Sequence, residues 1–453
     1  RFGWEGLEQL LEDKPALVKY NKLDCLCLLD LVLKMRKGYL EMFDEDVFKS
    51  LTISSYGYKI LQENWSGLKA FKSTLDGIDK DDAKEKIKNF KPKFNILKAQ
   101  NFRDDAFHRS SLTAGRVQTF YDKCKLEFPM AMADVKSLYP TVMGNYGGTD
   151  CPYPYGRYKK TNTYVEGKLG IYKVNVKHQN CKWKNPKKIK SQFKTMKNKF
   201  NVDLEKEYAP NVIPLREQDK PLQWYFQGEL KEIALTSVDI VVLRWATEDK
   251  DCVEVLWGHY WENSNKDIFY EFLDNPKKEK TKQDWNKVND PDSYNVAKRE
   301  GSKMISNSQS GKLLEAIHED EMCEFSTQKY LDWCKDDDVK EIEINDFGGG
   351  FTTMKGKRSC ESVFNNTKMD KRKPAYLGMF IYSYARRLMY KEIMSKYITL
   401  YMDTDSACMP LIEWDRMNNE NGRELIENGE YGCLEEEVCD LQKCDRCSNF
   451  TEK

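Results

Sequence analysis

The sequence predicts a mixed α/β (α+β) fold, because it contains two strand-like segments and two helical ones. Residues 128–133 form a short apolar run that ends at an acid, Asp134. Residues 397–410 form a second apolar run with acids at its centre, a pattern typical of a hairpin. Residues 25–35 and 376–390 have the pattern of helices. Strands and helices are therefore expected in the same chain.

Two carboxylates stand at the centre of the predicted hairpin. In an extended chain alternate side chains share a face, so Asp403 and Asp405 are expected to project together while Thr404 points away. Two acids this close repel each other unless a cation lies between them. Mg²⁺ prefers a few carboxylate oxygens plus substrate phosphates. A further acid, Asp134, would complete a two-metal site for phosphoryl transfer.

The chain is expected to turn into a helix directly after Asp134. Ser137 is a candidate N-cap, and Pro140 falls in the first helical turn. The backbone N–H groups of Ser137, Leu138 and Tyr139 would then face an anion. These three residues are therefore candidates for binding a phosphorylated substrate.

The order and spacing of these patterns resemble a known family. Asp-x-x-Ser-Leu-Tyr-Pro at residues 134–140, followed by Tyr-x-Asp-Thr-Asp-Ser at 401–406, is similar to palm motifs A and C of family B DNA polymerases. Motif B, Lys-x-x-x-Asn-Ser-x-Tyr-Gly, is matched between them at residues 303–311, except that Ser310 replaces the usual tyrosine. One such pattern is weak evidence. Three in family order form a strong signal.

The resemblance implies nucleotidyl transfer to a primer on template DNA, with deoxynucleoside triphosphates as substrates. Asp134 and Asp405 would hold two Mg²⁺ ions, with Mn²⁺ as the alternative ion. Val135, next to Asp134, is included in the metal site, and Asp403 would be a supporting acid.

The resemblance also assigns residues to the incoming nucleotide. Lys303 would neutralise the triphosphate, helped by Arg299 one helical turn earlier, and Asn307 lies on the same predicted helix. Tyr139 occupies the position that lies beneath the incoming deoxyribose in this family.

Two further segments extend the match toward the amino terminus. Tyr20 and Asp24 resemble the third motif of the proofreading exonuclease, Tyr-x-x-x-Asp. Residues 110–117 resemble the Thr-Gly-Gly-Arg element of the protein-primed branch, in which Gly115 and Arg116 would contact the template strand; an ordinary linker is the alternative. In that branch, found in viruses, linear plasmids and mobile elements, a terminal protein serves as primer.

The implied fold is a right-hand polymerase with an antiparallel palm sheet, helical fingers and the remnant of an RNase H-like 3′–5′ exonuclease domain. The chain opens on Arg1, and no thumb element follows motif C, so we expect the central part of a longer polymerase. The expected segments are an exonuclease remnant (1–50), a linker and entry to the palm (51–127), palm with motif A (128–160), an inserted subdomain with the palm–fingers connection (161–285), fingers with motif B (286–314), a second insertion (315–370) and palm with motif C (371–453).

Several local features carry expectations of their own. Residues 153–156 predict a turn and 167–176 a strand, and residues 77–95 predict a charged linker or an exposed helix. The aromatic residues of the 376–390 helix are expected in the core, and Arg386 or Arg387 is a candidate partner for an acid.

Charge and cysteine content bound the setting. The formal net charge is zero, so any electrostatic DNA footprint must be local. Residues 177–199 carry nine lysines and no acid, and form either such a surface or a solvated basic loop. Irregularly spaced cysteines, with no signal peptide and no membrane-spanning run, indicate an intracellular protein of the host cytoplasm or nucleus, neither secreted nor membrane-bound. Cys444 and Cys447 have the spacing of one half of a zinc site.

Two other functions remain open at this point. A two-metal nuclease would also use clustered acids and phosphate-binding lysines, but it would not need Lys303 and Asn307 between the acids. A noncatalytic DNA-binding fragment of a polymerase would retain all the motifs. Primer extension with magnesium separates the three, because it yields extension, degradation or mere retention of DNA.

Overall fold

The structure, a computed structural model, divides into two compact units, residues 1–89 with 269–309 and residues 90–268 with 310–453. It describes residues 14–75, 77–120, 129–177, 187–202, 229–315, 320–324, 327–337, 339–346, 352–420, 431 and 433–436. Cys444 and Cys447 lie outside the described residues. The predicted mixture of helices and antiparallel strands is confirmed.

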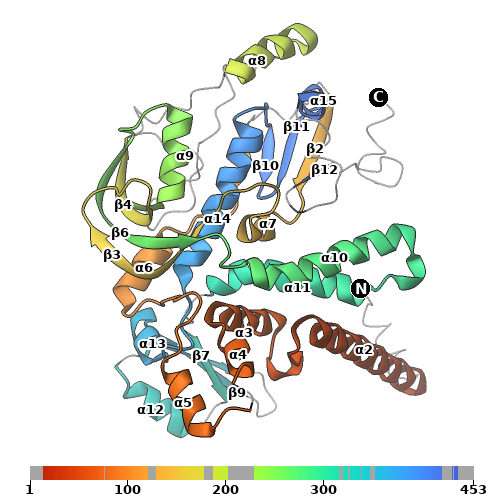
Figure 1. Ribbon diagram of the computed structural model, residues 1–453, viewed down its shortest axis with the longest axis vertical. Coiled ribbons are helices and arrows are strands. Elements are labelled where there is room, and N and C mark those ends of the chain that lie inside the picture. Colours follow the sequence, from red (N-terminus) through yellow and green to blue (C-terminus); the bar gives the residue numbers. More distant parts are fainter. Residues whose placement is uncertain are drawn as a thin grey trace. The chain divides into compact units, whose positions relative to one another are not determined.

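The first unit is helical in its described residues. Its α10 and α11 lie side by side as a helical hairpin joined by η2 (Figure 1). The predicted 25–35 helix is confirmed as part of the longer α2, and residues 80–88 form the predicted exposed helix, α5. The elements are α2 (Lys14–Phe43), η1 (Val47–Lys49), α3 (Ile53–Ser66), α4 (Leu68–Ser73), α5 (Lys80–Lys88), α10 (Tyr270–Asn289), η2 (Pro291–Ser293) and α11 (Val296–Leu313), whose last residues belong to the second unit.

Local sequence signals set the limits of α3. The Thr52 hydroxyl accepts a hydrogen bond from the Ser55 N–H at 3.1 Å and so satisfies one of the free donors of the first turn. At the other end Gly67 adopts a φ of 68°, a left-handed conformation that glycine reaches without steric cost. The apolar face between these caps buries Tyr56 and Leu61 in the core of the first unit.

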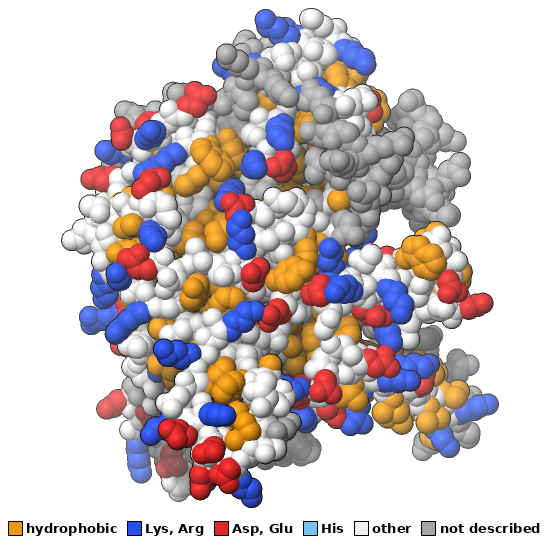
Figure 2. All heavy atoms as spheres, in the orientation of Figure 1, with side chains coloured by type: hydrophobic (Ala, Val, Ile, Leu, Met, Phe, Trp, Pro, Cys, Tyr) orange, Lys and Arg blue, Asp and Glu red, His pale blue; other side chains and the backbone are white. Residues whose placement is uncertain are grey.

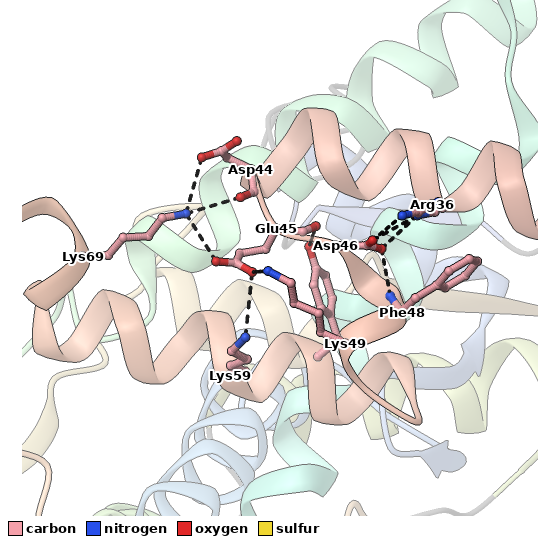
Figure 3. A network of polar contacts seen from close by, with 9 residues as sticks. Arg36, Asp44, Glu45, Asp46, Phe48, Lys49, Lys59 and Lys69 are labelled. Carbon is pink, nitrogen blue, oxygen red and sulfur yellow. Dashed lines mark hydrogen bonds and ion pairs between the residues drawn. The ribbon is translucent and has the colours of Figure 1, made fainter. Parts of the chain in front are cut away.

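An ion-pair network fastens the turn that follows α2 (Figure 3). Glu45 lies 3.3 Å from Lys49, 3.5 Å from Lys69 and 3.8 Å from Lys59. Asp46 accepts hydrogen bonds from the Phe48 N–H and from Arg36, and it thereby caps η1. The three lysine side chains are 46–62% exposed, so each pair contributes about 0.2–1 kcal/mol at most.

The second unit is built on a five-stranded antiparallel sheet in the order β1-β10-β11-β2-β12. Helix α14 packs against α7 and α9 in the same unit (Figure 1). Its aromatic side chains Tyr376, Phe380 and Tyr384 are buried, as expected, but Tyr382, which was expected in the core with them, is only partly buried. The elements are β1 (Val117–Thr119), β2 (Met130–Val135), α7 (Leu138–Gly144), α9 (Ser237–Thr247), α14 (Ala375–Met389), η3 (Tyr390–Met394), β10 (Tyr401–Asp403), β11 (Ser406–Pro410), α15 (Leu411–Glu420) and β12 (Leu434–Glu436).

Two further antiparallel sheets belong to the second unit. A four-stranded sheet has the order β3-β6-β4-β5, and a three-stranded sheet has the order β7-β9-β8. Their strands and the remaining helices are α6 (Phe102–Ser110), β3 (Tyr153–Thr161), β4 (Leu169–Lys177), α8 (Lys187–Phe200), β5 (Glu229–Thr236), β6 (Val253–Asn265), β7 (Asp320–Glu324), α12 (Thr327–Cys334), β8 (Val339–Asp346), β9 (Thr352–Arg358) and α13 (Cys360–Asn366).

One local prediction in this unit is wrong and another is confirmed. Residues 153–156 begin strand β3 instead of forming a turn. The glycine of the predicted turn, Gly156, takes a φ of 83° at a register shift between β3 and β6, so it serves a β-bulge. The predicted strand at 167–176 is confirmed as β4.

The lysine-rich stretch is helical where it is described. Residues 187–199 lie in α8, so a basic loop is excluded for them, and Phe193 is buried.

On the face shown in Figure 2, basic and acidic side chains are interspersed. None of the helices in the described part of the chain is long and apolar enough to cross a membrane.

Candidate active site

The five-stranded sheet brings together the acids of two distant sequence motifs. Ser406 on β11 pairs with Asp134 of β2 on one side and with Asp403 of β10 on the other. Residues directly opposite each other in antiparallel strands project to the same face. Asp134 of motif A and Asp403 of motif C therefore share one face of the sheet, separated by one strand.

The position of Asp405 differs from the one expected for an extended chain. Thr404 and Asp405 form the turn between β10 and β11, and φ at Thr404 is 55°. The alternation expected between Asp403 and Asp405 therefore fails, because the chain reverses between them. The Asp405 carbonyl accepts a hydrogen bond from the Val135 N–H at 2.8 Å. The turn is thus fastened directly to the residue that follows Asp134.

Two residues with a positive φ lie beside these acids. Thr404 and Ser137 both adopt a φ of 55°, in the left-handed region that residues other than Gly, Asn and Asp rarely enter. Ser137 does stand at the N-cap position of α7, as predicted, but its side chain makes no capping hydrogen bond. Such conformations cost about 1–3 kcal/mol each and persist where the surrounding structure enforces them, often at functional sites.

The segment that contains Gly115 lies directly against the strained turn. The Thr404 N–H donates to the Arg116 carbonyl at 2.6 Å. A Cβ added to Gly115 would lie 2.5 Å from Oγ1 of Thr404, so only glycine permits this approach. The Arg116 side chain is only 4% exposed and donates to Gln118 at 2.9 Å. The DNA contact predicted for Gly115 and Arg116 stays a prediction.

A buried ion pair supports this segment from α14. The Arg386 guanidinium lies 2.8 Å from a carboxylate oxygen of Asp239, and both residues are buried. Arg386 also donates hydrogen bonds to the carbonyls of Thr113 and Ala114. The expectation that Arg386 or Arg387 pairs with an acid is confirmed for Arg386. Its partner Asp239 carries no motif signal in the sequence.

Tyr139 lies close to the acids. Burial raises the pKa of its hydroxyl above the ordinary value, and the nearby Tyr382, Asp405 and Asp403 raise it further. Its ring packs against Tyr382 with 4.8 Å between the centroids. The preceding Leu138 is buried and anchors α7. The sequence analysis placed Tyr382 in the core with the other aromatic residues of its helix, because an apolar pattern does not show which ring turns toward Tyr139.

The motif B residues are placed on α11 in the first unit. Lys303 and Asn307 are exposed and lie one turn apart, as the i, i+4 spacing predicts. Arg299 is partly buried and donates to Asp284 at 2.6 Å and to Glu300. Their roles toward a triphosphate remain predictions.

The two exonuclease-motif residues lie on α2. Tyr20 and Asp24 are both exposed, with 61% exposure for Tyr20. They lie one turn apart on the helix, where side chains four residues apart are neighbours. Their exonuclease role remains a prediction.

The candidate metal donors are oxygen atoms. They are the carboxylates of Asp134 and Asp405 and, since its side chain is apolar, the carbonyl of Val135. Within the described ranges, no three His, Cys, Asp or Glu side chains gather closely enough to hold a metal ion. Two carboxylates without a complete protein cage suit Mg²⁺, which keeps waters and substrate phosphates among its ligands. The donor chemistry therefore fits the predicted ion.

Comparison with known families gives one match over most of the chain. The family described as DNA polymerase type B, organellar and viral, matches residues 12–398. This range contains Asp134 and the motif B residues and ends before Asp403 and Asp405.

Individual relatives are more distant. The chain is 28% identical over 134 residues to "Uncharacterized protein 075R" of Invertebrate iridescent virus 3, covering 29% of this chain and 81% of that protein. Phi29 DNA polymerase with primer-template DNA and incoming nucleotide is similar at a TM-score of 0.47 and 16% identity, over 85% of this chain and 52% of that one. Phi29 DNA polymerase with single-stranded DNA is similar at a TM-score of 0.46 and 15% identity, over 85% of this chain and 51% of that one. The chain thus spans about half the length of these solved structures.

Proposed function

The chain belongs to the DNA polymerases of type B, organellar and viral, and on this premise we propose that it is a DNA-directed DNA polymerase. The family resemblance drawn from the three motifs is thereby confirmed. The observation that carries the proposal is the geometry of the five-stranded sheet. There Asp134 and Asp403 both pair with Ser406, and the turn that bears Asp405 is bonded to Val135.

The proposed reaction is attack of a primer 3′-hydroxyl on the α-phosphate of a deoxynucleoside triphosphate, with release of pyrophosphate. Asp134, Asp405 and the carbonyl of Val135 would hold two Mg²⁺ ions, with Mn²⁺ as the alternative. When bound, these ions stabilise the attacking and leaving oxygens of the displacement. Asp403 is the most exposed of the three acids, which suits a supporting role.

Residues outside the sheet would bind the nucleotide. Lys303 and Asn307 present polar groups on one exposed face of α11, and a lysine there would neutralise triphosphate charge. Arg299 would contribute only by exchanging its contact with Asp284 for one with phosphate. Ser137 and Leu138 would offer backbone N–H groups at the start of α7.

The proposed partners are template-primer DNA and, as the primer for initiation, a terminal protein. Protein priming is supported by the Gly115–Arg116 element and by the long spans between motifs. Since Gly115 lies against the Thr404 turn, a template strand that contacts this element would lie close to the catalytic acids. This closeness gives a physical reason why the Gly115–Arg116 element would contact the template strand beside the proposed active site.

A primer-extension assay with Mg²⁺ tests the proposal on the full-length protein. Asp134→Ala or Asp405→Ala should abolish synthesis while the melting temperature is retained, because neither substitution opens a core cavity. Asp403→Ala should reduce synthesis less. Asp415→Ala, which removes an exposed acid on α15, is the matched control and should leave extension at the parental rate.

The same assay separates the competing functions. Shortening of the primer that depends on Asp134 would indicate a nuclease. Retention of labelled DNA with neither extension nor shortening would indicate a noncatalytic DNA-binding protein. An Asp405→Ala enzyme that extends primers at the parental rate would contradict the assigned site.

A further inference from the structure

Motif B of this chain lacks an aromatic ring that the family usually has. Position 310 carries serine, and Ser310 is 3% exposed, so the replacement lies in a packed interior. Its hydroxyl is hydrogen-bonded to Tyr382. A tyrosine from α14 thus contacts the residue at which motif B lacks its tyrosine.

Tyr382 stands apart from the other aromatic residues of its helix. Tyr376, Phe380 and Tyr384 on α14 are at most 2% exposed and form core. Tyr382 is only partly buried. Its ring lies 4.8 Å from that of Tyr139, at an interplanar angle of 56°. The helix therefore directs one aromatic ring away from the core and against Tyr139.

The two rings lie beside the catalytic acids. The charges of Asp405 and Asp403 raise the pKa of the Tyr139 hydroxyl, after the larger effect of burial and that of Tyr382, so both carboxylates are near. Tyr139 lines a small cavity together with Gly115, Met402 and Thr404 of the five-stranded sheet and its flanking segment, and with Arg386 and Met389 of α14. The ring contact with Tyr382 therefore lies in the same part of the second unit as this cavity and the two carboxylates.

We infer that Tyr382 is a specificity-determining residue that holds Tyr139 against the incoming sugar and supplies the ring that motif B lacks. The inference rests on the proposed polymerase function, in which Tyr139 lies beneath the deoxyribose. A tyrosine side chain rotates about χ1 unless neighbours confine it. Tyr382 confines Tyr139 on one side and is itself held through Ser310. The 2′-hydroxyl of a ribonucleotide would then clash with the Tyr139 ring, because the ring could not rotate out of its way.

The test measures incorporation of single ribonucleotides and deoxynucleotides by the full-length enzyme. Tyr139→Val removes the wall and should cause the largest loss of sugar discrimination. Tyr382→Leu should lower the ratio of kcat/KM for dNTP to that for rNTP on the order of tenfold, about the upper strength of one aromatic pair. The change should appear mainly as a lower KM for the ribonucleotide. Tyr382→Phe keeps the ring and should retain most of the discrimination.

A matched control comes from the same helix. Tyr384 packs on Tyr153 and donates to the Pro152 carbonyl at 2.6 Å, away from Tyr139. Tyr384→Leu should lower the melting temperature without changing the discrimination ratio. If both variants lose similar amounts of stability but only Tyr382→Leu loses sugar discrimination, the loss is not a general effect of disturbed packing.

An exchange of side chains tests whether Tyr382 replaces the motif B ring. Ser310→Tyr alone should overcrowd the contact with Tyr382 and reduce activity. The double variant Ser310→Tyr/Tyr382→Ser returns the ring to motif B and should recover both activity and discrimination. Such non-additivity is expected only for residues in direct contact.

The possible failures are distinguishable. A parental enzyme that extends primers, with Tyr382→Leu folded and fully discriminating, contradicts the inference and leaves the polymerase function intact. If Tyr382→Leu does not fold, the double variant Ser310→Tyr/Tyr382→Ser provides the test. A double variant that is no more active than Ser310→Tyr contradicts the inference. A parental enzyme that binds DNA but never extends a primer contradicts the proposed function and the inference together.

Discussion

Two acid-containing clusters in the second unit differ in how completely their polar groups are enclosed. At the five-stranded sheet, Asp403 is exposed and Asp134 and Asp405 are partly exposed, beside a strained turn. At the four-stranded sheet, Asp104 is 7% exposed and accepts hydrogen bonds from Tyr158 and Asn101. The first cluster has acids open to a ligand, and the second has an acid enclosed by the protein.

The enclosed cluster also contains two buried histidines. His108 and His259 lie 2.9 Å apart between ring nitrogens, and the ring of Tyr158 stacks on His259. Burial lowers the pKa of His108 to about 3 and that of His259 to about 4. Burial opposes ionisation of Asp104, but hydrogen bonds from Tyr158 and Asn101 outweigh it and lower the pKa. A perturbed pKa here reflects structure, which shows that enclosure must be weighed before such a group is considered catalytic.

The largest expected effect is on stability, at the enclosed cluster. Asp104→Ala leaves the Tyr158 hydroxyl and the Asn101 amide without their acceptor, so the free energy of unfolding should fall by about 3 kcal/mol. Primer extension by the folded fraction should be unchanged. Urea unfolding beside an extension assay at low temperature measures both, with Asp415→Ala as control. If Asp104→Ala instead lost primer extension while keeping its full stability, the enclosed cluster would be functional and not structural.

The next effect is on catalysis, at the open cluster. In Gly115→Ala the new Cβ would lie 2.5 Å from Oγ1 and 2.6 Å from Cγ2 of Thr404, so the turn that bears Asp405 must shift. A misplacement of about 1 Å can cost on the order of 100-fold in rate, and kcat for extension should fall accordingly. Adding Thr404→Gly removes the clash and tolerates the positive φ, so it should restore much of the rate. Gly38→Ala, whose Cβ would make only an ordinary contact, is the control. Parental kcat in Gly115→Ala would show that the turn need not be held in place.

A smaller effect concerns pH. The pKa values of His108 and His259 are depressed, so between pH 6.5 and about 4 the unfolded chain binds more protons than the folded one. Their stabilisation is complete above pH 6.5 and is lost as pH falls through about 4 for His259 and about 3 for His108, by at most about 1.4 kcal/mol per pH unit for each histidine. Urea midpoints from pH 7.5 to 4.5 measure the slope. A His108→Gln/His259→Gln protein should show a flatter slope, and an equal slope would assign the pH dependence to other groups.

The smallest effect is expected at an acid outside both clusters. Asp24 is exposed on α2, so Asp24→Ala should change the free energy of unfolding by no more than about 0.5 kcal/mol. If it holds a metal for proofreading, the full-length protein should lose 3′ to 5′ degradation while extension is retained. Chemical unfolding and a paired degradation assay measure the two. A large loss of stability would mean that Asp24 is structural after all.

The sequence by itself determined the family and most of the local structure near the acids of motifs A and C. The apolar run before Asp134 predicted β2, the apolar segment with Asp403 and Asp405 predicted the β10–β11 hairpin, and both helical patterns are confirmed. These features follow from periodicity and turn chemistry, which act between residues close in the chain. The family was predicted from the three motifs, because their residue types and their order along the chain match those of family B DNA polymerases.

The tertiary structure alone decided how these pieces meet. The register that sets Asp134 and Asp403 on either side of Ser406, the contact of Gly115 with Thr404 and the pairing of Tyr382 with Tyr139 all join segments far apart in sequence. The reversal at Thr404 overturned the alternation predicted for the acids, since the surrounding strands enforce a φ that local preference disfavours. Long-range packing can impose such a conformation because many contacts share its cost, and no local pattern in the sequence records them.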